Sequence, residues 1–231
     1  MLESVFLPAA SRDSRRLMIV LHGLGDSLDG FRSLPTEINL PWLNYLLVNA
    51  PNTYFTGFSW FDFPGDPVPG ADRSYLQLQQ LLDAQRERGY PTEQTVLFGF
   101  SQGGLMVWEV GIRYPHRFAG CIAISGFTRE PEQLLKLRSP CAAQQRFFIT
   151  HGMMDTTIPI ETSQDQVEQL KQAGLQVEWT EIIKGHTIEP FGEILLIRRA
   201  IERFFQNGAA GNSGAGPYHS RAPDSAASGE R

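Results

Sequence analysis

A serine between two closely spaced glycines is the residue whose setting most directly suggests chemistry. Residues 99–103 read Gly-Phe-Ser-Gln-Gly, which places Ser101 at the centre of a G-x-S-x-G pattern. In this pattern the serine lies on a sharp turn from a strand to a helix, and a Cβ at either glycine would crowd the neighbouring backbone. Largely apolar runs precede and follow the pattern, at residues 96–98 and 105–112, as a strand and a helix require. The pattern therefore predicts a nucleophilic Ser101.

A nucleophilic serine needs a base, and the sequence has only five histidines from which to choose one. In doubly wound hydrolases with this pattern the acid and then the histidine follow the serine along the chain. His186 satisfies this order, in a turn that follows the last predicted strand. His22 precedes the serine, and His151 precedes the preferred acid. We therefore interpret His186 as the base and His22 as a structural residue of its loop.

The acid that orients the base should also follow a strand, and Asp155 does so, after residues 146–150. Asp165 falls within a helical pattern, and Glu161 stands at a helix start, where it favours the helix dipole. Taken alone, His186 is better explained as a histidine of a surface turn, and Asp155 is also typical of a turn-forming residue. The order of serine, acid and base, each after a separate strand, makes Asp155 the preferred acid.

Acyl transfer at a serine also requires hydrogen-bond donors for the oxyanion that forms on the carbonyl oxygen. One expected donor is the backbone N–H of Gln102, the residue that follows the nucleophile. The other is expected in the loop after the strand at residues 17–21, and Leu24 in the run His-Gly-Leu-Gly is the preferred residue.

Strands and helices alternate along most of the chain, which predicts an α/β fold with a mostly parallel sheet. The expected strands are residues 4–7, 17–21, 45–48, 96–98, 119–124, 146–150 and 177–183. The expected helices are residues 72–89, 105–114, 131–137, 161–173 and 190–205. Asp72 is the expected N-cap of the first of these helices.

Two other segments differ from this alternation. Residues 51–71 form an aromatic loop rich in glycine and proline, and long loops of this kind are often functional. Residues 207–231 are dominated by Ala, Gly, Ser and Pro without hydrophobic periodicity, which predicts a disordered tail. The sequence thus predicts one domain over residues 1–206, followed by the tail.

The composition excludes several classes of function. The net charge of −5 and the pI near 5.6 argue against a nucleic-acid partner. No apolar run approaches about 20 residues, and the N-terminus lacks the pattern of a signal peptide, so we expect no integral membrane association and a cytoplasmic location. The histidines have no metal-ligand spacing, so no metal is expected.

Five sequence blocks together resemble the phospholipase/carboxylesterase family of α/β-hydrolases, which includes the acyl-protein thioesterases. The blocks are Leu-His-Gly-Leu-Gly-Asp at 21–26, Ser-Trp-Phe-Asp at 59–62, Gly-Phe-Ser-Gln-Gly-Gly at 99–104, His-Gly-x-x-Asp at 151–155, and Gly-His at 185–186. They cover about residues 15–205 in order. The resemblance implies an α/β-hydrolase fold, doubly wound with helices on both faces and with little or no cap domain.

The same resemblance implies a triad of Ser101, Asp155 and His186 that works without a metal or another cofactor, with oxyanion donors at Leu24 and Gln102. The implied substrates are small-molecule or lipid-like acyl esters, and possible thioesters. We expect Trp60 and Phe61 to line an apolar groove for the acyl group, although these rings could instead hold their loop on the core. Residues 127–146 do not match the family clearly, so acyl-chain preference stays open.

Several functions share this machinery. Carboxylesterase, acyl-protein thioesterase and lysophospholipase activities all remain open, as does the oligomeric state. A non-catalytic α/β binding scaffold is the alternative from another class. Such a scaffold would be expected to lack a triad residue or to have a blocked serine turn, and the sequence shows neither.

Overall fold

The centre of the molecule is a seven-stranded sheet in the order β1-β3-β2-β6-β7-β8-β9. The computed structural model of the chain describes residues 2–209. β1 runs antiparallel to β3, and the other five neighbouring pairs are parallel. The strands are β1 (Ser4–Leu7), β2 (Leu17–Leu21), β3 (Asn44–Val48), β6 (Thr95–Phe100), β7 (Gly120–Ile124), β8 (Arg146–Gly152) and β9 (Gln176–Ile182).

Burial along the strands explains why the apolar runs were recognisable in the sequence. Every residue of β2, β3 and β7 is buried, because helices cover both faces of the central strands. The edge strands β1 and β9 instead mix exposed with partly buried residues. The mostly parallel sheet predicted from the sequence is therefore confirmed.

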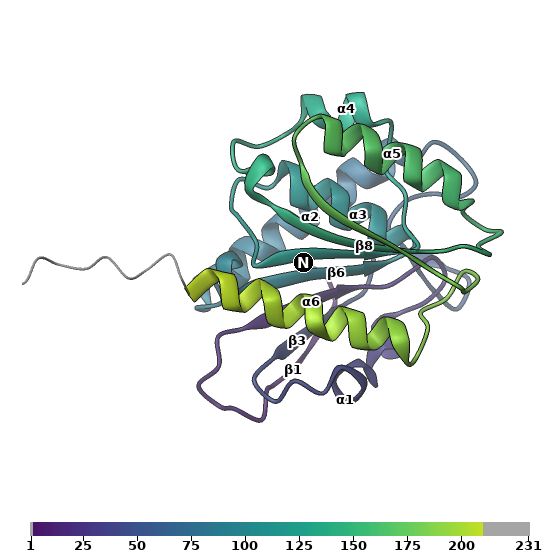
Figure 1. The fold of residues 1–231 in the computed structure, drawn as a ribbon. Helices are drawn as coiled ribbons and strands as arrows, with labels where there is room; N and C mark the ends of the chain where they lie inside the picture. The colour runs from purple at the N-terminus through teal and green to yellow at the C-terminus, as the bar shows by residue number, and fades with distance from the viewer. Residues whose placement is uncertain (1, 210–231) are drawn as a thin grey trace, which may run out of the picture.

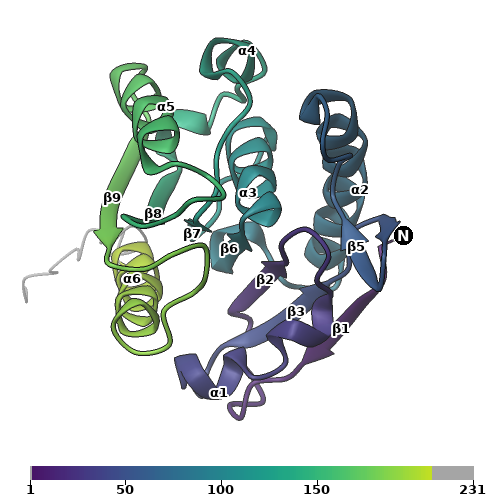
Figure 2. The same cartoon turned by 90° about the vertical axis from the view of Figure 1, so that its right-hand side faces the viewer.

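Helices cover both faces of this sheet (Figures 1 and 2). One face carries α2 (Pro67–Glu87), α3 (Gln102–Arg113), α4 (Pro131–Lys136) and α5 (Ile160–Gln172), and the other carries α1 (Leu34–Ile38) and α6 (Gly192–Ala209). Short 3₁₀ helices occupy Leu28–Phe31, Thr92–Gln94 and Ala142–Gln144. Each face has its own apolar core, one beneath α2 and α3 and the other beneath α1 and α6. This is the α/β-hydrolase fold, and within residues 2–209 no cap domain covers the carboxyl edge of the sheet.

The structure corrects three expectations about element boundaries. The aromatic loop contains a small hairpin of β4 (Asn52–Tyr54) and β5 (Gly57–Ser59). α2 begins at Pro67, with the side chain of Asp66 accepting a hydrogen bond from the Val68 N–H, so the expected N-cap at Asp72 was wrong. Proline at the first helical position favours this earlier start.

The last correction concerns the end of the domain. α6 continues to Ala209, three residues beyond the boundary expected at residue 206. The rest of the expected tail, residues 210–231, lies outside the described part of the chain.

Candidate active site

Ser101 lies at the turn between β6 and α3, and its backbone has a φ of 55°. Positive φ is uncommon for a residue with a Cβ and stores backbone strain. The flanking glycines make room for this turn. A Cβ on Gly99 would collide with the carbonyl oxygen of Gly103, and a Cβ on Gly103 would collide with that of Leu21. The two glycines of the sequence pattern are therefore required by close backbone packing.

Three side chains from the carboxyl ends of different strands meet at this turn. Nε2 of His186 lies 2.9 Å from Oγ of Ser101, and Nδ1 of the same ring lies 2.7 Å from Oδ2 of Asp155. Asp155 lies in the loop after β8, and His186 lies in the loop after β9. The structure thus brings together the serine, acid and base that the sequence singled out.

Backbone donors hold the Asp155 carboxylate in place. Its Oδ1 accepts hydrogen bonds of 2.9 Å from the N–H groups of Thr157 and Ile158. Burial acts to raise the pKa of Asp155, but the hydrogen bonds from Ile158 and His186 outweigh it, and the pKa lies below its ordinary value. The carboxylate is therefore ionised at neutral pH, which favours a proton on Nδ1 of His186 and leaves Nε2 free to accept from Ser101.

The two other histidines near the sheet edge are buried. Nδ1 of His22 donates to the carbonyl oxygen of Gly23, and its Nε2 accepts from the Ala50 N–H. His151 donates through Nε2 to the Ile158 carbonyl oxygen. Burial is the main cause of a lowered pKa in both rings. His22 therefore links two loops as a neutral ring.

The side chain of Gln102 holds the loop that carries the Trp-Phe pair. Its Oε1 accepts from the Trp60 N–H at 3.0 Å, and its Nε2 donates to the Phe61 carbonyl oxygen at 3.2 Å. The Trp60 indole N–H donates to the His22 carbonyl oxygen, and the side chain is fully buried. The structure therefore places Trp60 in the core, where it fixes the loop, and does not bring it to the cavity expected to hold the acyl group.

A cavity of about 260 Å³ opens beside Ser101. Its walls are mainly aromatic and aliphatic: Phe61, Phe63, Phe100, Phe127 and Ile158. Phe61 thus lies where the sequence placed it, while Phe127, Thr157 and Ile158 were missed. No local pattern marks these three residues, because only folding brings their loops to the serine.

The residues expected to donate to an oxyanion lie at the same cavity. Leu24 and Gln102 both line it, together with Ser101. Gln102 is the first residue of α3, and the first N–H groups of a helix have no intrahelical acceptor. The loop of Leu24 is held by a hydrogen bond of 2.9 Å from the Gly25 N–H to the Phe58 carbonyl oxygen.

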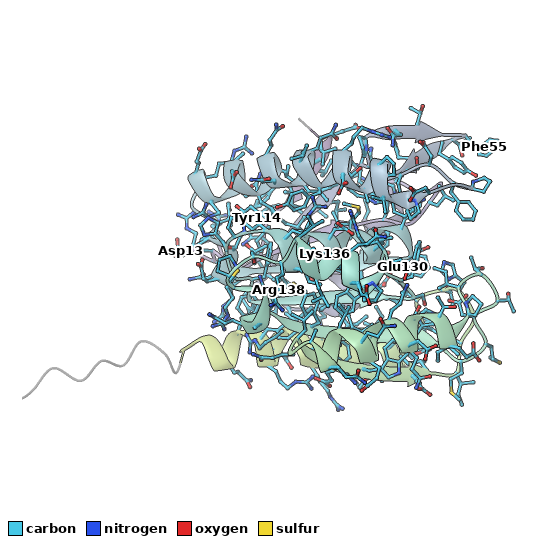
Figure 3. The ribbon with its side chains drawn as sticks, turned by 90° about the horizontal axis from the view of Figure 1, so that it is seen from above. Asp13, Phe55, Tyr114, Glu130, Lys136 and Arg138 are labelled. Atoms are coloured by element: carbon cyan, nitrogen blue, oxygen red, sulfur yellow. The ribbon has the colours of Figure 1, made fainter. Side chains whose placement is uncertain are left out.

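Other parts of the aromatic loop point elsewhere. Phe55 projects into solvent with 92% of its surface exposed, as Figure 3 shows at one end of the molecule. Among the described residues, no three His, Cys, Asp or Glu side chains are grouped as a metal site would require. Within the same part of the chain, no helix has the length and apolar character needed to cross a membrane.

The fold and the site together define an α/β-hydrolase, and comparison with known proteins narrows the class. The profile of the phospholipase/carboxylesterase family matches residues 3–192. The chain is 29% identical over 155 residues to acyl-protein thioesterase 1 of Schizosaccharomyces pombe, covering 62% of this chain and 69% of that protein. It is 26% identical over 216 residues to a probable inactive carboxylesterase of Oryza sativa subsp. japonica, covering 85% and 88%.

Solved structures agree with these relatives. The crystal structure of esterase PE8 superposes with a TM-score of 0.78 at 26% identity, over 88% of this chain and 99% of that one. The chain belongs to the phospholipase/carboxylesterase family and is a carboxylic ester hydrolase.

Proposed function

We propose that the protein is a serine hydrolase that cleaves carboxylic esters through an acyl-enzyme on Ser101, with His186 as the base and Asp155 as its orienting acid. The observation that carries this proposal is the continuous pair of hydrogen bonds, 2.9 Å from Ser101 to His186 and 2.7 Å from His186 to Asp155. A nucleophile within hydrogen-bond reach of a base, with the base held by a third group, is the geometry that activates a serine.

In the first half-reaction, Nε2 of His186 takes the proton from Ser101 Oγ as the oxygen attacks the acyl carbonyl carbon. The imidazolium returns this proton to the leaving-group oxygen as the carbon–oxygen bond of the ester breaks. The acyl group remains on Oγ. In the second half-reaction, a water loses its proton to the same nitrogen and attacks the acyl carbon, which releases the acid and restores Ser101. Asp155 stabilises the imidazolium in both steps.

The tetrahedral intermediate carries negative charge on the former carbonyl oxygen. The backbone N–H groups of Leu24 and Gln102 are the donors proposed for this oxyanion, because both residues line the cavity beside Ser101. The start of α3 adds a favourable helix dipole at the same place. Loss of a single such donor typically slows acyl transfer by about 10²–10³-fold.

The walls of the cavity favour an apolar acyl group. Phe61, Phe63 and Phe127 present rings, and Ile158 an aliphatic side chain, to a space of about 260 Å³. Small-molecule or lipid-like acyl esters are therefore the proposed substrates. The acyl-protein thioesterase among the relatives supports thioesters as an alternative, and the phospholipase/carboxylesterase family supports lysophospholipids as another. An acyl-chain series of esters measured against matched thioesters separates these subtypes.

The test of the proposal is hydrolysis of a p-nitrophenyl acyl ester by the Ser101→Ala variant. We expect turnover to fall to the uncatalysed rate, while the thermal unfolding midpoint shows that the variant is folded. Ser125→Ala is a matched control, because Ser125 is a buried serine with positive φ at the end of the neighbouring strand β7. Unchanged turnover in Ser101→Ala would refute the mechanism, whereas a wild type with no turnover above the uncatalysed rate would favour the non-catalytic scaffold.

A further inference from the structure

A second cavity, of about 360 Å³, borders the same histidine from the other side of the sheet edge. It shares Asp26, Phe100 and His186 with the cavity described above. Its remaining walls come from the Leu28–Phe31 3₁₀ helix, from α1 and from the loop that leads into α6. Figure 2 shows α1 and α6 on one face of the sheet. Because residues of α1 and of the loop before α6 line this cavity, it extends toward that face.

The cavity beside Ser101, by contrast, is built by loops that lead into the opposite helices. Phe61 and Phe63 precede α2, Phe127 precedes α4, and Ile158 precedes α5. We call the cavity lined by these four residues the apolar arm. We call the second cavity the acidic arm; its lining residues include Asp26, Ser33, Glu37 and Thr187. The two arms meet at His186.

The charge of the acidic arm has one sign. Asp26 and Glu37 line it, and no lysine or arginine is among its lining residues. The arginine closest along the chain, Arg32, forms an ion pair of 2.5 Å with Asp29, so that cation is already matched. Neither Asp26 nor Glu37 has an ion-pair partner within residues 2–209.

The carboxylate of Asp26 is fixed in position. Its Oδ1 accepts a hydrogen bond of 2.7 Å from the Ser27 N–H. The carboxylate also packs directly over Gly30, where a Cβ would collide with both of its oxygens. The Asp26 carboxylate therefore faces the acidic arm in a fixed position and does not have to reorganise when a ligand binds.

We propose that the acidic arm binds the leaving group of the substrate, and that it selects esters whose leaving group carries a positive charge over those with a negative charge. This inference rests on the proposed function, because it takes His186 as the proton donor to the leaving oxygen. That oxygen must lie at Nε2 of His186, and the acyl chain occupies the apolar arm. The leaving group then extends past the imidazole toward Asp26 and Glu37.

Three octanoyl esters test the proposal: octanoylcholine, its uncharged isostere 3,3-dimethylbutyl octanoate, and the anionic 2-sulfoethyl octanoate. Each kcat/KM is divided by the rate of hydrolysis by hydroxide to remove differences in leaving-group reactivity. We expect the cationic ester to exceed the anionic one by about tenfold at low ionic strength, with the neutral ester between them. Added salt should reduce the difference, because the arm is open to solvent.

The Glu37→Lys variant makes the test independent of intrinsic reactivity, since the same esters are compared in two proteins. The ratio of cationic to anionic kcat/KM should fall by about tenfold or more, because one substitution changes the charge of the arm by two units. Glu132→Lys is the matched control, because Glu132 is exposed on α4 over the opposite face. It should leave the ratio unchanged.

Two results overturn the inference: a wild-type ratio within twofold of one, or a ratio that Glu37→Lys leaves unchanged. If p-nitrophenyl esters are hydrolysed through Ser101 and either result is found, only the assignment of the acidic arm fails. If Ser101→Ala retains turnover of every ester, the proposed function fails and the assignment fails with it.

Discussion

Two groups of largely buried charged side chains lie near the two cavities, and they differ in size and in the segments that they connect. Lys184 and Glu193 form a pair beside the turn that carries His186, with the Lys184 Nζ 2.7 and 2.9 Å from the carboxylate oxygens. Asp72, Glu109, Arg113 and Arg129 form a cluster of four, in which Asp72 is partly exposed and Arg129 lies two residues after Phe127. The pair supports the turn that carries His186, whereas the cluster supports the segment that follows Phe127 in the apolar arm.

The pair connects the His186 turn to a helix and to a strand. Besides Glu193, the ammonium of Lys184 donates to the carbonyl oxygen of Thr187 at 2.7 Å. The Glu193 carboxylate also accepts from the Thr150 hydroxyl on β8 and from the Glu189 N–H. Both charged side chains are almost fully buried. The turn is thereby tied on both sides of the imidazole.

The cluster connects three segments that are far apart in the sequence. Arg129, two residues after Phe127, donates to both oxygens of Glu109 on α3 and to Asp72 on α2. Arg113 donates to the same two carboxylates. Two cations and two anions therefore balance around a shared set of hydrogen bonds. Each of these irregular segments is therefore held by largely buried charged side chains, which have few alternative partners if one member is lost.

The largest loss of stability is expected when the cluster of four charged side chains is broken. Glu109→Gln leaves Arg113 and Arg129 facing the single carboxylate of Asp72, so the free energy of unfolding should fall by about 3–5 kcal/mol. Urea denaturation measures the loss. The exposed Glu132→Gln on α4 serves as the control and should change stability by less than about 0.5 kcal/mol. A loss equal to that of the control would show that the cluster contributes no net stability.

Lys184→Met should have a smaller effect on stability and a larger one on catalysis. Glu193 keeps two donors, so we expect a loss of about 2–3 kcal/mol in the free energy of unfolding. Because the turn loses its tie at Thr187, kcat should fall more than KM changes. The double variant Lys184→Met/Glu193→Gln should regain part of the stability, as a coupled pair requires. Exposed Lys136→Met is the control, and an unchanged kcat in Lys184→Met would contradict the positioning role.

A pH-dependent effect separates the cluster of four from the two buried histidines. His22 and His151 have lowered pKa values in the folded protein, mainly through burial, so below about pH 6.5 the unfolded chain binds more protons than the folded one. Stability should therefore fall on acidification from pH 7 to pH 5, by at most about 1.4 kcal/mol per pH unit for each proton.

The cluster of four has no histidine among its hydrogen-bond or ion-pair partners in the described structure. The destabilisation by Glu109→Gln should accordingly be the same at pH 7 and pH 5. Urea unfolding curves of the wild type and the variant at both values give the comparison. A wild-type stability that rises toward pH 5 would contradict the neutral, buried state of the two histidines.

The sequence was sufficient for the parts of the fold that depend on continuous patterns. Central strands such as β2 are buried on both faces and therefore read as unbroken apolar runs. The serine, acid and base could be selected because each follows a strand, and the carboxyl ends of parallel strands share one edge of the sheet.

The sequence was insufficient where function depends on contacts between distant loops. Trp60 and Phe61 are adjacent and equally aromatic, yet Gln102 and His22 hold Trp60 in the core while Phe61 reaches the cavity. Asp72 was predicted to cap a helix. Its observed ion-pair partner, Arg129, lies 57 positions away in the sequence, so the sequence alone did not reveal the pair. Neither buried charge group could be recognised without the positions of its members in space.

Covalent labelling with a fluorophosphonate, which reacts with activated serines, tests whether Ser101 is the nucleophile. After labelling and tryptic digestion, mass spectrometry should find the adduct on the peptide of residues 89–113, in which Ser101 is the sole serine. Labelling should disappear in Ser101→Ala and should be strongly reduced in His186→Ala. An adduct on another serine, or equal labelling of Ser101→Ala, would contradict the assignment of Ser101 as the nucleophile.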